Sequence, residues 1–215
     1  MTETDATAGL LCLQGGREFT PECVDMDRTV IARSSARLVA VLAGAARVGS
    51  DYDGASDRAR RHYSGLGADV RVIPDPRVDV DGALAALDEE IDLIVLPGGS
   101  PSGLLDVLSG TVRARVRELH SSGTAISGAS AGAMVLCTSV VRPDRGGGVV
   151  DGIGLVDGLA LPHWSPGTTR WRVPDVTLWG LPECGGVVID GDDRRAVGRG
   201  EPSMRLDGDW SPLPR

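Results

Sequence analysis

The stretch Thr124-Ala-Ile-Ser-Gly-Ala-Ser-Ala-Gly-Ala-Met-Val-Leu-Cys137 carries the most informative pattern of this chain. A short apolar strand runs into Gly128-Ala-Ser-Ala-Gly132, and an apolar, helix-forming segment follows at once. This order is typical of a nucleophile elbow, in which a serine occupies a strained turn between a strand and a helix. Ser130 is the candidate nucleophile. The Ala131 N–H, at the positive end of the helix dipole, is a candidate oxyanion donor. The alternative is a plain turn in a chain with 30 glycines.

Apolar strands and helical segments alternate before this stretch. Buried strands are expected at residues 9–13, 37–42, 68–73 and 91–96, and helices at 25–35, 51–67, 79–90 and 111–120. A strand that is followed by a helix and then by another strand predicts right-handed βαβ crossovers. The expected fold class is therefore α/β, a three-layer sandwich with a mostly parallel central sheet.

Short strands are also expected in the C-terminal part of the chain. They are predicted at residues 186–190, 196–199 and 203–206, where Asp-Gly and Gly-Glu-Pro turns separate apolar segments. These strands extend the sheet or form a dimer surface. Trp210, near the end, is interpreted as a packing anchor.

Length and composition restrict the class of protein. With 215 residues and 41% apolar content, the chain is expected to form a single domain, residues 1–215, with residues 1–8 disordered. A formal net charge of −8 lacks the basic footprint of a nucleic-acid-binding protein. No apolar run is long enough for a membrane span, and the acidic N-terminus lacks the apolar core of a signal peptide. These features predict a cytoplasmic protein without nucleic-acid or membrane partners.

The four cysteines do not form a metal-binding pattern. Cys12, Cys23, Cys137 and Cys184 show no CxxC or other metal-ligand spacing. Cys12 and Cys137 lie in apolar runs, where buried thiols are common. We expect a reduced protein that needs no metal and no organic cofactor.

A second glycine-rich turn follows the predicted strand at 91–96. Its sequence is Pro97-Gly-Gly-Ser-Pro-Ser102, and in a parallel sheet it lies at the same edge as the elbow. Gly98 and Gly99 have no side chain to block access, so their N–H groups are candidate donors to the substrate and to an oxyanion. A simple loop into the next helix is the alternative.

A catalytic serine needs a base, and the chain offers three histidines. His62 lies in a polar, arginine-rich helix, and His120 at a helix end is interpreted as a solvated cap, so both are interpreted as structural. His163 follows the apolar run 159–162 at a strand end. As the only histidine after Ser130, it is the candidate general base.

The acid that orients the base is sought after His163. Glu183 stands at the tip of a Gly and Pro turn that follows the apolar segment 176–182. Asp151, Asp157 and Asp175 are competitors, but they stand in ordinary turn contexts. The order serine, histidine, acid differs from that of α/β-hydrolases, in which the histidine comes last.

Four ordered motifs resemble one known family. They are Leu96-Pro-Gly-Gly99, Gly128-Ala-Ser-Ala-Gly-Ala133, Leu161-Pro-His163 and Gly180-Leu-Pro-Glu183. The chain resembles the serine peptidases that include dipeptidase E (aspartyl dipeptidase) and cyanophycinase. Their fold is similar to that of class I glutamine amidotransferases. Gly15-Gly-Arg-Glu18 and Gly152-Ile-Gly-Leu155 are similar to further segments of that family.

The resemblance implies hydrolysis of a small peptide or isopeptide by a Ser-His-Glu triad. Ser130, His163 and Glu183 are its expected members, with the Gly99 and Ala131 N–H groups at the oxyanion and Gly98 in contact with the substrate. Arg170, in the dipeptide Thr169-Arg170, matches an arginine that reads an acidic substrate side chain in the dipeptidase branch. A homodimer is an expected assembly, because dimers are common in this family.

Two other interpretations stay open. An amidotransferase or other acyl-transfer enzyme normally carries a cysteine at the elbow, where this chain has Ser130. The second alternative is a binding protein that has lost turnover. The presence of all three candidate triad residues argues against it.

Overall fold

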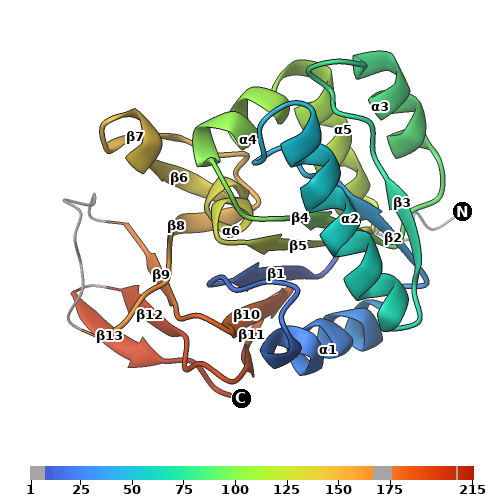
Figure 1. Cartoon of the computed structure of the whole chain (residues 1–215). Helices are drawn as coiled ribbons and strands as arrows, with labels where there is room; N and C mark the ends of the chain where they lie inside the picture. Colours follow the sequence, from blue (N-terminus) through green and yellow to red (C-terminus); the bar gives the residue numbers. More distant parts are fainter. Residues whose placement is uncertain (1–7, 167–175, 207) are drawn as a thin grey trace, which may run out of the picture.

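The protein is built around two β-sheets, shown in Figure 1. The computed structural model describes residues 8–166, 176–206 and 208–215. All but one of the residues expected to be disordered at the N-terminus lie outside the described residues. In spatial order, the seven strands of the main sheet are β11 (Asp193–Gly198), β10 (Gly185–Asp190), β1 (Leu11–Gln14), β5 (Ala125–Ala129), β4 (Leu93–Leu96), β2 (Leu38–Val41) and β3 (Asp69–Val72).

The centre of the main sheet is parallel, as the alternating pattern predicts. Strands β1, β5, β4, β2 and β3 pair in parallel, whereas β10 pairs antiparallel with β1 and β11 antiparallel with β10. All four residues of β4 are buried, which explains its continuous apolar sequence. The predicted α/β class with a mostly parallel sheet is confirmed.

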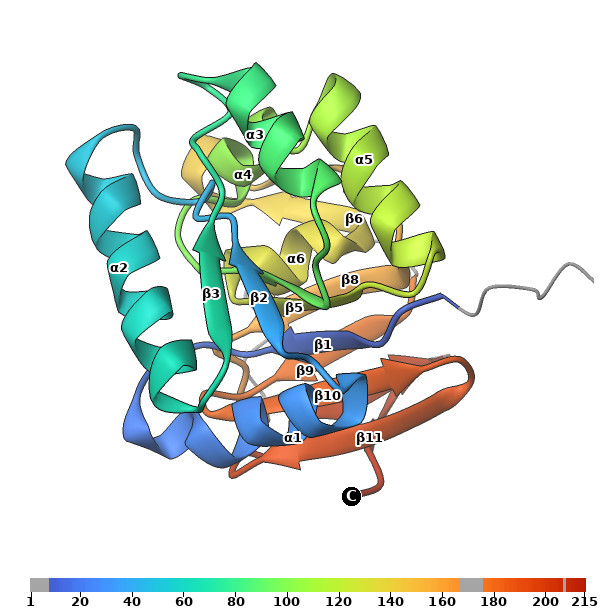
Figure 2. The ribbon, with the colours of Figure 1, turned by 90° about the vertical axis from the view of Figure 1, so that its right-hand side faces the viewer.

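Helices cover both faces of this sheet (Figures 1 and 2). Their bounds are α1 (Val24–Ser34), α2 (Ser50–Gly65), α3 (Val80–Asp88), α4 (Pro101–Val107), α5 (Gly110–Ser121) and α6 (Ala131–Leu136). Met26 of α1 and Tyr63 of α2 belong to one apolar cluster with Val95 of the sheet. Helices α3 to α6 contribute to a second cluster on the other face.

The second sheet was not expected from the sequence. Its six strands are β13 (Asp209–Pro212), β12 (Ser203–Leu206), β9 (Leu178–Leu181), β8 (Val156–Pro162), β6 (Cys137–Arg142) and β7 (Gly148–Asp151). The apolar segment after the elbow was predicted to be helical through residue 137, but α6 ends at Leu136 and β6 begins at Cys137. Because β6 pairs in parallel with β8, this strand depends on a partner further along the chain.

The C-terminal strands divide between the two sheets. The segment predicted at 186–190 forms most of β10, and the one at 196–199 covers the second half of β11; both strands extend the main sheet. The segment at 203–206 is β12, which pairs with β9 in the second sheet. Trp210 of β13 packs against Trp164, with ring centroids 4.8 Å apart, so its prediction as a packing anchor is confirmed.

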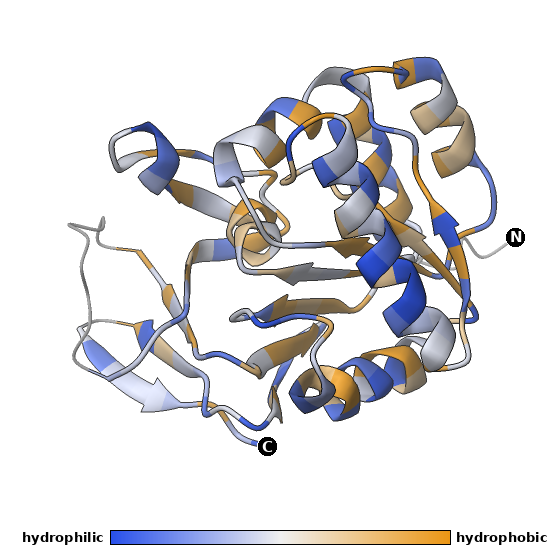
Figure 3. Cartoon of the chain, viewed as in Figure 1, coloured by the Kyte–Doolittle hydropathy of each residue, from blue (hydrophilic) through white to orange (hydrophobic). Residues whose placement is uncertain are grey.

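Apolar residues concentrate on the strands of the main sheet, whereas much of α2 is polar on the side seen in Figure 3. Large side chains that are fully buried include Leu13 of β1, Ile94 of β4 and Ile126 of β5. No helix within the described ranges is long and apolar enough to cross a membrane.

Two helix glycines provide a test of how tightly α6 packs on the sheet. A Cβ atom on Gly132 would lie 2.1 Å from the carbonyl oxygen of Leu96, whereas a Cβ on Gly65 would meet nothing within 4 Å. We expect Gly132→Ala to lower the free energy of unfolding by about 2–3 kcal/mol through overpacking. We expect Gly65→Ala to leave it unchanged or raise it by up to about 1 kcal/mol. Urea unfolding of both variants measures this, and equal effects would contradict the prediction.

Candidate active site

Ser130 stands on a strained turn between β5 and α6. Its backbone has φ 50° and ψ −108°, a conformation that costs a non-glycine residue about 1–3 kcal/mol. The turn is possible because Gly128 and Gly132, two positions before and after Ser130, have no side chain. A Cβ on Gly128 would lie 2.5 Å from the carbonyl carbon of Gly132. The geometry is that of the predicted elbow, with the serine raised at the carboxyl edge of the sheet.

The structure brings the three candidate triad side chains together. Ser130 Oγ lies 3.0 Å from His163 Nε2. His163 Nδ1 lies 3.4 Å from Glu183 Oε1, and both of these side chains are 51% exposed. His163 follows the end of β8 and Glu183 follows the end of β9, two neighbouring parallel strands of the second sheet. Serine, imidazole and carboxylate therefore form a continuous chain of polar contacts that is open to solvent.

Arg17 is a further charged residue of this chain of contacts. Its Nη1 lies 4.0 Å from Glu183 Oε2, the carboxylate oxygen that does not face His163. Both side chains are about half exposed, so the contribution of this pair to stability is small. Its effect is local, because it places a positive charge on the far side of the carboxylate.

The end of β1 and the two glycines that follow it hold the backbone of Ser130, of His163 and of the residue next to Glu183. The carbonyl oxygen of Gln14 accepts the Ser130 N–H at 2.9 Å, and that of Gly15 accepts the His163 N–H at 3.0 Å. The carbonyl oxygen of Gly16 accepts the N–H of Cys184, the neighbour of Glu183, at 3.2 Å. Three successive carbonyl groups thus fix the three segments that carry the candidate triad residues.

Gly15 and Gly16 allow the β1 end to lie close to the segments of His163 and Glu183. A Cβ on Gly15 would lie 2.0 Å from the carbonyl oxygen of Pro182. A Cβ on Gly16, whose φ is +135°, would lie 2.4 Å from His163 Cε1. Any side chain at position 16 would therefore displace the imidazole ring from Ser130.

The glycine-rich loop after β4 lies beside Ser130. Gly99 has φ +145°, and a Cβ there would lie 2.5 Å from the carbonyl oxygen of Ala45. The Gly98 N–H donates a hydrogen bond of 2.9 Å to Glu18 Oε1. The Gly99 and Ala131 N–H groups donate to no other described residue. They therefore have the free donor capacity that an oxyanion requires.

Asp144 holds the start of α4, directly after this loop. Its carboxylate accepts hydrogen bonds from the hydroxyl groups of Ser100 and Ser102, the latter at 2.8 Å. Burial acts to raise the pKa of Asp144, but these hydrogen bonds outweigh it, and the pKa lies below its usual value. The contact ties the glycine-rich loop to the connection between β6 and β7.

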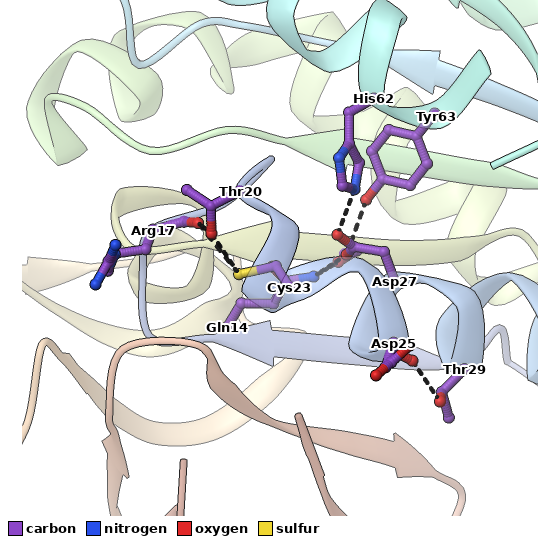
Figure 4. A network of polar contacts seen from close by, with 10 residues as sticks. Gln14, Arg17, Thr20, Cys23, Asp25, Asp27, Thr29, His62 and Tyr63 are labelled. Carbon is purple, nitrogen blue, oxygen red and sulfur yellow. Dashed lines mark hydrogen bonds and ion pairs between the residues drawn. The ribbon is translucent and has the colours of Figure 1, made fainter. Parts of the chain in front are cut away.

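A buried polar network lies next to the end of β1 (Figure 4). Asp27 of α1 is 1% exposed and accepts a hydrogen bond of 2.8 Å from the Gln14 side chain. The Tyr63 hydroxyl donates to the same Asp27 oxygen, Oδ1, at 3.3 Å, and the other oxygen, Oδ2, lies 2.7 Å from His62 Nε2. Gln14 also donates to Ser127 of β5 at 3.0 Å. The network joins α1, α2 and β5 to the strand end that holds the segments of the candidate triad.

The other two histidines lie outside the site. His62 belongs to the Asp27 network, and its structural interpretation agrees with these contacts. His120 was interpreted as a solvated cap, and this is wrong, because the residue is only 8% exposed. Burial lowers the pKa of His120. The helix end is covered by the segment before β1, where the Gly9 N–H donates to the His120 carbonyl oxygen.

The four cysteines are free and buried. Burial raises the pKa of Cys12 and of Cys137 to about 12, so these thiols stay protonated at neutral pH. Cys137 therefore cannot serve as the nucleophile that an amidotransferase requires. In the described part of the chain, no group of three or more His, Cys, Asp or Glu residues is arranged to hold a metal ion.

Some expected residues were not placed, and some site residues were not expected. Arg170 and Asp175 lie outside the described residues. Gln14, Arg17 and Glu18 were not assigned roles from the sequence, although Gly15-Gly-Arg-Glu18 was noted as a family-like segment. Its position after the first strand, at the same sheet edge as the elbow, was the signal for its place in the site.

The fold and these contacts define an α/β protein in which a serine at the carboxyl edge of the main sheet meets a histidine and a glutamate at the carboxyl ends of two strands of the second sheet. A family model, peptidase family S51, matches residues 20–193. The chain therefore belongs to peptidase family S51, a family of serine peptidases with the class I glutamine amidotransferase-like fold.

Solved structures show the same fold. The chain is similar to a peptidase from an acI-B1 actinobacterium, with a TM-score of 0.82 and 22% identity over 98% of this chain and 96% of that chain. It is also similar to a putative peptidase E protein from Listeria monocytogenes EGD-e, with a TM-score of 0.69 and 16% identity over 90% of this chain and 100% of that chain. A comparison with curated proteins finds no match.

The Asp27 network predicts a large loss of stability when its central carboxylate is removed. Asp27→Ala leaves the buried side chains of Gln14 and His62 without their partner. We therefore expect the free energy of unfolding to fall by about 3–5 kcal/mol. Asp25→Ala, on the exposed side of the same helix, is the control and should change the value by less than about 1 kcal/mol. Urea unfolding followed by circular dichroism measures both, and similar effects would contradict a stabilising role for the network.

Proposed function

We propose that this protein is a serine peptidase that hydrolyses dipeptides or isopeptides through Ser130, His163 and Glu183. The observation that carries the proposal is the 3.0 Å contact between Ser130 Oγ, on its strained elbow, and His163 Nε2. Such an elbow aims the hydroxyl at an incoming carbonyl group, and the adjacent base removes its proton. Membership of family S51 supports the reaction class.

The proposed reaction is acyl transfer through a covalent ester. His163 Nε2 takes the Ser130 proton as Oγ attacks the amide carbonyl, while Glu183 accepts a hydrogen bond from Nδ1–H and fixes the tautomer. The Gly99 and Ala131 N–H groups hold the oxyanion. His163 then donates the proton to the leaving amine, and water releases the acyl group from Ser130.

Two residues are proposed to contact the substrate. Gly98 leaves space beside the nucleophile, since a Cβ there would lie 3.1 Å from Ser130 Cβ. Arg170, by its family resemblance, is proposed to bind an acidic side chain at the N-terminal residue of the substrate.

We further propose that residues 1–215 act as one peptidase domain and that the protein forms a homodimer. Light scattering of the purified chain would measure the mass of this assembly.

Labelling with a fluorophosphonate probe tests the nucleophile. We expect wild type to react and Ser130→Ala to remain unlabelled, because the probe phosphonylates only an activated hydroxyl group. Release of amine from dipeptides with N-terminal Asp, Glu, Leu, Ala or Arg, and from β-aspartyl-arginine, then defines the substrate. We expect Ser130→Ala to lose at least about a thousandfold in kcat/KM. Labelling that survives this substitution would disprove the proposed nucleophile.

Removing the orienting acid should slow the chemical step. We expect Glu183→Ala to lower kcat about a hundredfold with little change in KM, because the imidazole loses its preferred tautomer and orientation. Asp157→Ala is the control, since Asp157 was a competing acid and its carboxylate instead accepts from the Thr138 hydroxyl at 3.3 Å. Steady-state kinetics of both variants shows which of the two carboxylates, Glu183 or Asp157, supports the reaction. A Glu183→Ala enzyme as fast as wild type would remove this residue from the triad.

A further inference from the structure

Glu18 lies at the active site but has no part in the proposed triad. Its Oε1 atom accepts the 2.9 Å hydrogen bond from the Gly98 N–H. A Cβ atom built on Gly98 would lie 2.8 Å from that oxygen and 3.1 Å from Ser130 Cβ. The Glu18 carboxylate and the proposed nucleophile therefore both lie next to the Gly98 Cα atom, which carries no side chain.

The charge of Glu18 is not neutralised within the described ranges of the chain. Its neighbour Arg17 pairs with Glu183 instead, and no described arginine or histidine forms an ion pair with Glu18. A carboxylate has about four acceptor positions, and the Gly98 N–H takes one of them. A partly buried carboxylate with spare acceptor positions favours a cationic partner that enters beside Ser130.

A peptide substrate brings such a cation to this place. In an unblocked peptide the α-ammonium group is two bonds from the carbonyl carbon of the first residue, a separation of about 2.5 Å. When Ser130 attacks that carbonyl, the ammonium group comes within ion-pair reach of a carboxylate that borders the same glycine. In a β-linked isopeptide the ammonium group is only one carbon further away.

We propose that Glu18 binds the free ammonium group of the residue whose carbonyl Ser130 attacks. The enzyme is then specific for peptides and isopeptides with an unblocked N-terminal residue. This inference rests on the proposed function, because it takes Ser130 as the nucleophile and an amino-acyl group as the part transferred to it.

The test separates charge recognition from support of the Gly98 loop. Glu18→Gln removes the charge but keeps an oxygen that accepts the Gly98 N–H. Glu22→Gln makes the same change four residues along the same segment and serves as the matched control. The substrates are L-alanine 4-nitrophenyl ester and its N-acetyl derivative. Ser130→Ala gives the blank for both. Attack forms the Oγ–acyl bond, breaks the ester C–O bond and releases 4-nitrophenolate, so the reaction is measured without a peptide substrate.

Wild type should prefer the ester with the free ammonium group. We expect Glu18→Gln to lower kcat/KM for this ester at least tenfold, mainly through KM, and to change that for the N-acetyl ester less than twofold. Glu22→Gln should leave both values unchanged. This pattern supports the role of Glu18 even when no peptide of the panel is cleaved. Failure to cleave any peptide would overturn the peptidase function but not the role of Glu18.

Three results would overturn the role of Glu18. An equal loss for both esters would mean that the carboxylate only supports the loop. A gain for both would mean that it blocks the site. A wild-type enzyme that does not distinguish the two esters recognises no ammonium group.

Discussion

The site depends on the hydrogen bonds that the end of β1 makes with three other segments. Successive carbonyl groups of Gln14, Gly15 and Gly16 accept the N–H groups of Ser130, His163 and Cys184. These segments follow β5, β8 and β9, which belong to two different sheets. A shift of the β1 end would therefore move the proposed nucleophile, base and acid relative to one another. The Asp27 network next to it, which holds the Gln14 side chain, opposes such a shift.

Backbone strain is concentrated around this strand end. Among the described residues, the non-glycine positions with positive φ include Arg17, Phe19, Ser130, His163 and Cys184, all on segments at the site. Each such position costs of order 1 kcal/mol or more. Tertiary contacts must compensate for that cost, and the buried hydrogen bonds of Asp27 and the packing of α6 against β4 provide them. The strained backbone holds the side chains of Ser130, His163 and Glu183 close to one another, at a cost in stability.

The charges of the site follow from the same segment. Adjacent residues Arg17 and Glu18 leave the end of β1 and reach opposite parts of the site, the Glu183 carboxylate and the Gly98 N–H. The Arg17 cation therefore lies behind Glu183, the proposed orienting acid, and the Glu18 carboxylate lies beside the proposed nucleophile. The open, half-exposed position of His163 and Glu183 suits a small substrate that enters and leaves freely. These features explain how one short loop contributes to both the proposed chemistry and the proposed specificity.

Local patterns in the sequence determined the strands and helices of the main sheet, the elbow at Ser130, and the strand ends that precede His163 and Glu183. Apolar periodicity and turn residues report burial and backbone conformation over a few neighbours, so these features could be predicted. The tertiary structure alone decided the second sheet, the antiparallel pairing of β10 with β1, the burial of His120, and the contacts of Arg17 and Glu18. Those depend on residues far apart in the chain, such as Glu18 and Gly98, which are 80 positions apart. No local pattern records such a contact, because it exists only once the sheets have packed.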